Sequence, residues 1–323
     1  MEIIDQGVWS VSGRRKTQED RFLLHEYHES EKGHFLMAGI YDGHGGDAAS
    51  TTVSRYLPGK LREYLFDGIP ESDLSPERVK QSLEQSWDDI CEMYRMGCDG
   101  DDTCSADYDE IEGIIKAGTG SKDLVAGTTA TSILMPYDNA SHLIVLNCGD
   151  SRTLCVGEPC APSDHLPSPF SKSSYVHFAT RDHSPKDKLE EERLKRGRKE
   201  GLDYSLPECS IKKWFLQIGD YQYAVSRSLE GSFATSKGIV SNADMTTLCL
   251  KSVRSERKDA SVILASDGLF EVIDNELVAK IVTSSRNEGL TANEVTKRLC
   301  NEAIRKGSSD NISVIVIYLK AHE

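Results

Sequence analysis

Short apolar runs that end at an aspartate, asparagine or glycine are the feature that most limits what this chain can fold into. Most of them are rich in Val, Ile and Leu, which is typical of buried β-strands. Helical patterns lie in pairs between these runs, which favours an α+β fold with antiparallel sheets covered by helix pairs over a doubly wound parallel sheet. The predicted strands are 22–25, 34–41, 129–135, 142–147, 152–156, 261–265 and 312–319.

Capping residues mark the predicted helices. Ser75-Pro76-Glu77 combines an N-cap, a first-turn proline and an early acid. Asp274 can cap a second helix. Thr291 and Glu294 have the spacing of a capping box, and Gly307 would end the helix that follows in a left-handed conformation. Two more helices are predicted over 46–66 and 184–198, the latter opened by Ser184-Pro185.

Composition excludes several classes of protein. With 323 residues, 38% hydrophobic and 28% charged, the chain is typical of a soluble globular protein. Lys+Arg number 38 and Asp+Glu 52, so the net charge is −14, and no binding to nucleic acid or to an anionic membrane is expected. No run of about 18 apolar residues predicts a transmembrane helix. The first residues predict no signal peptide, and Glu2 stands where N-myristoylation needs glycine.

Cysteine usage indicates a reducing compartment. The nine cysteines include no Cys-x-x-Cys pair and no Cys/His cluster at zinc spacing. Reduced thiols are therefore expected, and with them a cytoplasmic or a nuclear protein. The close pairs Cys98/Cys104 and Cys155/Cys160 leave a disulfide open as the less favoured alternative.

Two segments are predicted to be surface insertions in a single domain spanning 1–323, one near 98–122 and one near 157–174. The first is acidic, but position six of an EF-hand loop starting at Asp99 would be Cys104 instead of glycine. A solvated acidic loop is therefore favoured over a calcium site. The second segment is rich in Pro and Ser, which is typical of a long loop on a folded domain.

Acidic residues stand in turns at the ends of several predicted strands. Alone, an Asp-Gly step between apolar segments is most often a plain turn. At strand ends that meet at one edge of packed sheets, such acids would form a cluster, and clustered carboxylates repel unless a cation is present or their pKa values rise. Oxygen ligands favour a hard cation: Mg²⁺, Mn²⁺ or Ca²⁺. The acids are Glu19, Asp20, Asp42, Asp150, Asp267 and Asp310.

Two basic side chains lie near these acids in the sequence. His44 directly follows Asp42-Gly43. In isolation it is best interpreted as a turn histidine, but beside a metal site it becomes a candidate general acid, because its ordinary pKa lies near neutral pH. Arg15 is a surface charge in the simplest interpretation, and its planar guanidinium is also suited to bidentate phosphate binding.

The ordered motifs GRRKTQED, YDGHGG, AGTTA, NCGDSR, AVSRSL, ASDGLF and SSDNIS resemble the metal-dependent protein phosphatase 2C family. Each motif is weak alone, but the order and the distances are specific, and the resemblance runs from about Gly7 to Leu319. It implies two packed antiparallel β-sheets (a β-sandwich) flanked by pairs of antiparallel α-helices, with the site at one edge. It also implies serine/threonine-specific phosphatase activity on phosphoprotein substrates. A monomer is expected.

The resemblance further implies a centre of two Mg²⁺ or Mn²⁺ ions, with a third, more weakly held metal. By motif position, Asp42 would bridge both metals and the Gly43 carbonyl would bind one of them. Asp267 and Asp310 would hold one metal.

Five further residues match the family by position. Glu19 would bind the other metal or orient water at it, and Asp20 would support that water shell. Asp150 matches the ligand of the third metal. Arg15 matches the arginine that binds the substrate phosphate, and His44 matches the proposed general acid.

These implied roles agree with the chemistry of phosphate-ester hydrolysis. Two cations about 3.5–4 Å apart lower the pKa of a bridging water and yield hydroxide at neutral pH. That metal-bridging hydroxide would attack phosphorus in line, while metal and Arg15 balance the charge on the equatorial oxygens. His44 would protonate the leaving serine or threonine alkoxide.

The chain departs from the family pattern at two points near the site. Glu271 stands where the family often has aspartate, which bears on the geometry of the third metal. Leu229 is followed by Glu230-Gly231 where the family usually has a Gly-Asp pair, which bears on substrate preference.

Two alternatives remain open. A pseudophosphatase would keep the fold as a binding scaffold and should lack metal acids, whereas Asp42, Gly43, Asp267 and Asp310 are all present. The other alternative is a different metal hydrolase, such as a small-molecule phosphatase or a nuclease. The acidic balance of the chain counts against the nuclease.

Overall fold

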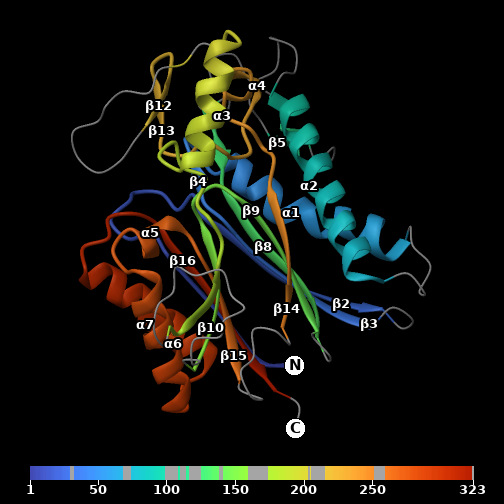
Figure 1. Cartoon of the computed structure of the whole chain (residues 1–323), viewed down its shortest axis with the longest axis vertical. Coiled ribbons are helices and arrows are strands. Elements are labelled where there is room, and N and C mark those ends of the chain that lie inside the picture. The colour runs from blue at the N-terminus through green and yellow to red at the C-terminus, as the bar shows by residue number, and fades with distance from the viewer. Residues whose placement is uncertain are drawn as a thin grey trace.

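The computed structural model describes residues 1–29, 33–67, 74–98, 108–109, 114–115, 125–137, 141–158, 174–202, 204, 215–250 and 259–321. Within these residues two five-stranded antiparallel sheets form the centre of the molecule, with helices on both outer sides (Figure 1). The α+β sandwich expected from the sequence is confirmed. Each predicted strand is present. The strand predicted over 129–135 is shifted by one residue to 130–136, and the others are longer than predicted by one to several residues.

The first sheet joins the two ends of the chain. The N-terminal strand lies at one edge of this sheet and pairs antiparallel with the C-terminal strand from Glu2↔Lys320 to Val11↔Ile312, with one register shift near Ile3. In sheet order the strands are β1 (Glu2–Val11), β16 (Ile312–Lys320), β15 (Ala260–Ala265), β10 (Arg152–Gly157) and β11 (Val176–Ala179).

The second sheet comes from the first half of the chain and one later strand. In sheet order its strands are β14 (Asp244–Cys249), β9 (His142–Cys148), β8 (Ala130–Pro136), β3 (Gly33–Tyr41) and β2 (Arg21–Glu29). Almost every residue of β3 and β8 is buried, which explains the continuous apolar runs of both sequences.

A pair of helices covers each sheet, as the pairing of helical patterns predicted (Figure 1). The second sheet carries α1 (Ala48–Arg62), a π-helical turn at Glu63–Asp67 and α2 (Pro76–Cys98). The first sheet carries the pair α6 (Asn275–Asn287) and α7 (Ala292–Arg305), preceded by the four-residue helix α5 (Asp267–Phe270).

The predicted caps of α6 and α7 are confirmed. The Asp274 side chain accepts a hydrogen bond from the Leu277 amide, and Thr291 and Glu294 form a reciprocal capping box. Gly307 adopts a φ of 97° just after α7, the left-handed conformation expected of a helix stop.

The prediction that Ser184-Pro185 opens a helix was wrong. The helix α3 (Lys188–Lys199) begins later, because Asp187 is its N-cap and its side chain accepts hydrogen bonds from the amides of Leu189 and Glu190. Ser184 instead lies in a turn, in which its carbonyl accepts from the Asp187 amide at 3.0 Å. Two carboxylate-bonded amides give Asp187 the better cap geometry.

Smaller elements lie near the ends of the two sheets. Two-residue strands β4 (Gly43–His44) and β7 (Gly127–Thr128) pair with each other, as do β12 (Leu216–Ile218) and β13 (Tyr221–Tyr223). A short helix, α4 (Ser232–Thr235), follows β13. The described part of the first predicted insertion includes the paired strands β5 (Tyr108–Asp109) and β6 (Ile114–Ile115).

Three apolar layers hold the sandwich together. One fills the space between the sheets and includes Leu36, Ile133, Val262 and Ile315, all fully buried. The other two lie between each sheet and its own helix pair. A fourth, small cluster around Leu194, Ile218 and Tyr223 joins α3 to the β12–β13 hairpin. The central strands of both sheets are therefore covered by apolar side chains on both faces, which fixes where their ends lie.

Some predictions fall on residues outside the described part of the chain. Most of the insertions near 98–122 and 157–174 lie there, as do Cys104 and Cys160, the second members of the two close cysteine pairs. Among the helices that the structure describes, none combines the length and the apolar character that crossing a bilayer requires.

Candidate active site

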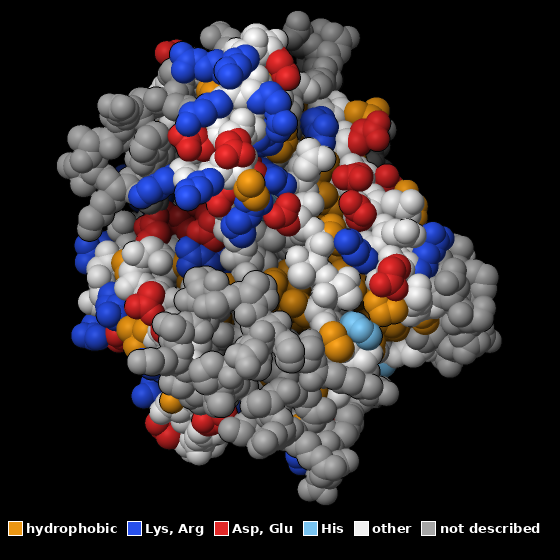
Figure 2. All heavy atoms as spheres, in the orientation of Figure 1, with side chains coloured by type: hydrophobic (Ala, Val, Ile, Leu, Met, Phe, Trp, Pro, Cys, Tyr) orange, Lys and Arg blue, Asp and Glu red, His pale blue; other side chains and the backbone are white. Residues whose placement is uncertain are grey.

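The predicted acids meet at one end of the sandwich. Asp42 directly follows β3, Asp267 begins α5 two residues after the end of β15, and Asp310 lies two residues before β16. They line one cavity of about 520 Å³. Figure 2 shows acidic side chains gathered in a hollow between α3 and the α5–α7 side of the molecule.

Nearly all of the predicted site residues line this cavity. They are Arg15, Glu19, Asp42, Gly43, His44, Asp150, Asp267 and Asp310. Asp20 lies behind it, only 3% exposed. Glu271, the departure from the family pattern, is an exposed residue at the end of α5.

Asp20 is held by two hydroxyl groups, one from the N-cap residue of α5 and one from β16. Ser266 and Ser313 donate to its Oδ2 at 2.9 Å and 2.7 Å. Its other oxygen, Oδ1, is buried and has no hydrogen-bond partner among the described residues. Burial raises the pKa of Asp20, with the two hydroxyl bonds opposing the rise. A buried carboxylate oxygen without a partner is expected beside a cation or its water shell.

Asp42 lies in the field of four other carboxylates. Burial raises its pKa well above the usual range, and the charges of Asp20, Asp267, Asp150 and Asp310 raise it further, in that order. The Asp267 amide approaches Asp42 Oδ2 at 3.4 Å. Repulsion of this kind is relieved by a divalent cation, and a set of oxygen donors without thiolate is what Mg²⁺ and Mn²⁺ prefer. The residues present therefore fit a hard-metal centre.

Gly43 allows two segments to approach closely. A Cβ on Gly43 would lie 2.4 Å from the Glu19 carbonyl oxygen, which also accepts a hydrogen bond from Ser50 Oγ at 2.6 Å. On the other side of the turn, the Thr129 amide donates to the Asp42 carbonyl at 2.9 Å. A side chain at position 43 would push the Glu19 segment away from the acids.

Arg15 and Asn311 fix the loop between β1 and β2. The Arg15 guanidinium contacts Asp310 Oδ2 through Nη2 at 2.7 Å, while its side chain remains 58% exposed. The Asn311 carboxamide accepts from the Glu19 amide at 2.8 Å and donates to the carbonyls of Ser12 and Thr17 at 3.0 Å and 2.9 Å. Asn311 thus positions Glu19, and its place directly after Asp310 was the sequence signal for that role.

His44 has a partner that the sequence did not reveal. Its Nε2 lies 2.6 Å from Glu230 Oε1, and Glu230 is 1% exposed. Ser228 Oγ also donates to Glu230 Oε1 at 2.6 Å. Burial would lower the pKa of His44, but the charge and the hydrogen bond of Glu230 outweigh it and raise that pKa. The departure from the family pattern at Glu230-Gly231 marked this position in the sequence. Nothing in the sequence indicated that Glu230 pairs with His44, 186 positions away.

Gly127 makes room for this buried acid. A Cβ on Gly127 would lie 2.2 Å from Glu230 Oε1 and 2.4 Å from Oε2.

Tyr223 forms an edge contact with the His44 ring at a centroid distance of 6.2 Å. Together with Phe215, Tyr221 and Val225, it contributes aromatic and apolar side chains to the lining of the cavity.

Comparisons with known proteins define the family. The family model described as "Protein phosphatase 2C" matches residues 4–312. The chain is 25% identical over 325 residues to Probable protein phosphatase 2C 61 of Arabidopsis thaliana, covering 98% of this chain and 86% of the relative. It is 26% identical to human Protein phosphatase 1A, covering 96% of this chain and 69% of the relative.

Solved structures share the fold. A serine-threonine phosphatase 2C from Toxoplasma gondii superposes with a TM-score of 0.70 at 20% identity, covering 98% of this chain and 95% of the other. A C. elegans sex determining protein gives the same TM-score and identity, covering 99% and 66%. The chain therefore belongs to the protein phosphatase 2C family, and the class of enzyme that this family defines is protein phosphatase.

Proposed function

We propose that this chain is a metal-dependent protein serine/threonine phosphatase that hydrolyses phosphoserine and phosphothreonine in phosphoprotein substrates. The observation that carries the proposal is the meeting of six carboxylates, Arg15 and His44 at one end of the sandwich. Membership of the family supports the reaction class. The carboxylates are Glu19, Asp20, Asp42, Asp150, Asp267 and Asp310.

The acids would hold Mg²⁺ or Mn²⁺. Asp42 is assigned to both metal positions, the Gly43 carbonyl to one of them, and Asp267 and Asp310 to one of them. Glu19 is assigned to the other metal or its water, with Asp20 behind it and Asp150 at a third, weaker position. When bound, such cations supply positive charge for the phosphate oxygens and lower the pKa of water.

Arg15 and His44 would act on the substrate itself. The exposed guanidinium of Arg15 can bind two phosphate oxygens while its contact with Asp310 sets its direction. His44 would protonate the departing alkoxide, which is a poor leaving group without a proton. Because Glu230 engages Nε2, we assign the donated proton to Nδ1.

The test is phosphate release from a phosphothreonine peptide with Mn²⁺, with Mg²⁺ and with EDTA. Turnover should require metal, and Asp42→Asn should nearly abolish it while the fold survives, because that carboxylate is assigned to both metals. Asp88→Asn, an exposed change on α2, is the matched control and should retain full activity. Near-normal activity of Asp42→Asn would refute the assignment.

A catalytically weak scaffold is the alternative. The observation that favours it is the buried Glu230, which occupies one of the two ring nitrogens of the proposed general acid. In a well-folded sample, absence of turnover with either metal would decide for the scaffold. Comparing rates on phosphopeptides, nucleotides and DNA separates a protein phosphatase from another metal hydrolase.

A further inference from the structure

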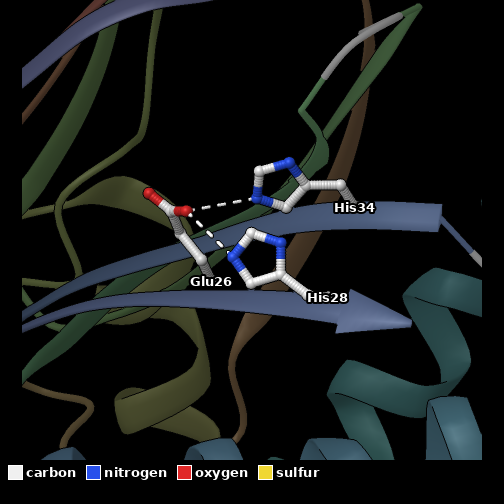
Figure 3. Close-up of side chains that lie close together, drawn as sticks. All are labelled: Glu26, His28 and His34. Atoms are coloured by element: carbon white, nitrogen blue, oxygen red, sulfur yellow. Dashed lines mark hydrogen bonds and ion pairs between the residues drawn. The ribbon is translucent and has the colours of Figure 1, made fainter. Parts of the chain in front are cut away.

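A second cluster of metal-ligating side chains lies on the β2–β3 hairpin. In Figure 3 the imidazoles of His28 and His34 point toward the same carboxylate oxygen of Glu26. The Nε2 atoms of His34 and His28 lie 3.2 Å and 3.3 Å from Glu26 Oε2. All three ligand atoms lie within 4.8 Å of one another.

The fold itself places these residues on one face. Glu26 and His28 are two apart on β2, so their side chains leave the same side of the sheet. His34 is the register partner of His28 on β3, directly across the ladder. Leu36, two residues further along β3, points into the layer between the two sheets. The cluster therefore lies at the rim of the inter-sheet layer, where apolar residues give way to polar ones.

Supporting contacts orient two of the three side chains. Gln6 on β1 donates through Nε2 to Glu26 Oε1 at 2.8 Å, which leaves Oε2 for the two histidines. The His34 ring stacks on Tyr137 at a centroid distance of 4.0 Å and an interplanar angle of 8°. Supporting groups of this kind hold metal ligands in place and are usual around bound ions. Gln6 belongs to the first sheet and Glu26 to the second, so the contact also joins the sheets.

The distances match those of a tetrahedral ion. Ligands at about 2.0–2.1 Å from zinc are separated from one another by about 3.3 Å along each tetrahedral edge. The two nitrogen–carboxylate distances already have that length. The third edge, between the two nitrogens, is at most 4.8 Å. The His28 side chain is 67% exposed and can rotate to close it.

We propose that Glu26, His28 and His34 bind one Zn²⁺ ion, with the fourth ligand position open to water. Two imidazoles and one carboxylate are a known zinc ligand set, whereas Mg²⁺ prefers oxygen ligands alone. The site is separate from the carboxylate centre. His34 lies near the start of β3 and Asp42 just beyond its end, roughly 26 Å apart at about 3.3 Å per residue.

Zinc at this position would act on stability rather than on chemistry. It would join β2 to β3 and, through Gln6, to β1 of the other sheet. A ligand that binds only the folded state stabilises it in proportion to the logarithm of its concentration. At Zn²⁺ about 100-fold above its dissociation constant, the melting temperature should rise by about 4 °C for a chain of this length.

The test is calorimetric titration of the full chain with Zn²⁺. Metal ions are first removed with a chelator, and saturating Mg²⁺ is then added to fill the proposed carboxylate centre so that Zn²⁺ is measured at the second cluster. One equivalent should bind to the wild type and equally to Asp42→Asn. His28→Gln and Glu26→Gln should each weaken binding by more than the roughly 10–100-fold that loss of a supporting group costs. His25→Gln is the matched control, because it changes a histidine of the same strand that faces the other way.

Cobalt provides an independent readout of the geometry. Bound Co²⁺ should show the intense visible absorption of a four-coordinate ion in the wild type and in His25→Gln, and lose it in His28→Gln. Equal Zn²⁺ binding by His28→Gln and the wild type would overturn the proposal. So would an absence of Zn²⁺ binding, which would leave the three residues as a hydrogen-bonded cluster only.

Discussion

Replacing Glu190 by glutamine removes the charge at the centre of a buried ion network. Glu190 lies on α3 with 0% exposure. Its Oε1 accepts hydrogen bonds from Arg227 Nη2 and Nε at 2.6 Å and 2.9 Å. Its Oε2 accepts from Arg193 Nε and from Ser226 Oγ, both at 3.0 Å. Arg193 also donates to the Ser226 and Gly238 carbonyls, so the network ties α3 to the segment that lines the active-site cavity.

Glutamine keeps the shape of the side chain but leaves two largely buried guanidinium groups with a neutral amide. Breaking a buried ion pair on one side costs about 3–5 kcal/mol. Arg227 keeps its contact with Asp244 at 3.0 Å, so the expected loss of unfolding free energy lies toward the lower end of that range. Unfolding entropy of about 2.1 cal/mol/K per residue gives about 0.7 kcal/mol/K for a chain of this length. The melting temperature should therefore fall by about 4–7 °C.

Differential scanning calorimetry at neutral pH measures this change. The matched control is Glu191→Gln, one residue along the same helix, whose ion pair with Lys195 is solvent-exposed. Exposed pairs of this spacing contribute about 0.3–0.5 kcal/mol, so the control should shift the melting temperature by less than about 1 °C. Equal shifts for the two variants would refute the reasoning, because burial would then make no difference.

Three further predictions concern the site and the same network. Arg15→Ala should mainly raise KM for a phosphopeptide in steady-state assays; an effect confined to kcat would contradict phosphate binding. Glu230→Gln should slow phosphopeptide hydrolysis more than p-nitrophenyl phosphate hydrolysis, whose leaving group needs little protonation, and equal losses would count against His44 as general acid. The stability difference between the wild type and Glu190→Gln, followed by melting temperature, should be full above pH of about 5 and shrink as the pH falls toward 2; a constant difference would refute it.

The sign of the pH effect follows from the pKa of Glu190. Burial alone would raise this pKa, but the hydrogen bond from Arg227 and the charges of Arg193 and Arg227 lower it to about 2. A group whose pKa is lower in the folded state stabilises the protein above its unfolded pKa, near 4.3. That contribution is lost as the pH falls through the folded value.

The buried elements of the fold could be predicted from the sequence. β3, β8 and β16 are apolar almost throughout, and the caps of α6 and α7 are local interactions within a few residues. β1 was missed because its burial alternates irregularly, with polar residues among the apolar ones. Its partner β16 lies at the other end of the chain, so its pairing leaves no local signal.

For the candidate site as well, residues marked by a local sequence pattern could be predicted, and residues that depend on tertiary contacts could not. The acids were found because each stands in a turn at the end of an apolar strand, a local pattern repeated along the chain. Glu230 and the Glu26–His28–His34 cluster depend on tertiary contacts. Glu230 lies 186 positions from His44, and the cluster needs β2 and β3 in register. No spacing of residue types indicates such contacts before the strands are placed.

Because Gly127 lies against Glu230, the residue that position 127 can accept depends on the residue at position 230. The carboxylate occupies the space that a side chain at position 127 would need, and moving it aside would cost its bonds to His44 and Ser228. A larger residue at 127 would therefore require the Glu230 carboxylate to shift and give up its bonds to His44 and Ser228, unless residue 230 is smaller. The effect of a substitution at 127 is therefore expected to depend on the residue at 230.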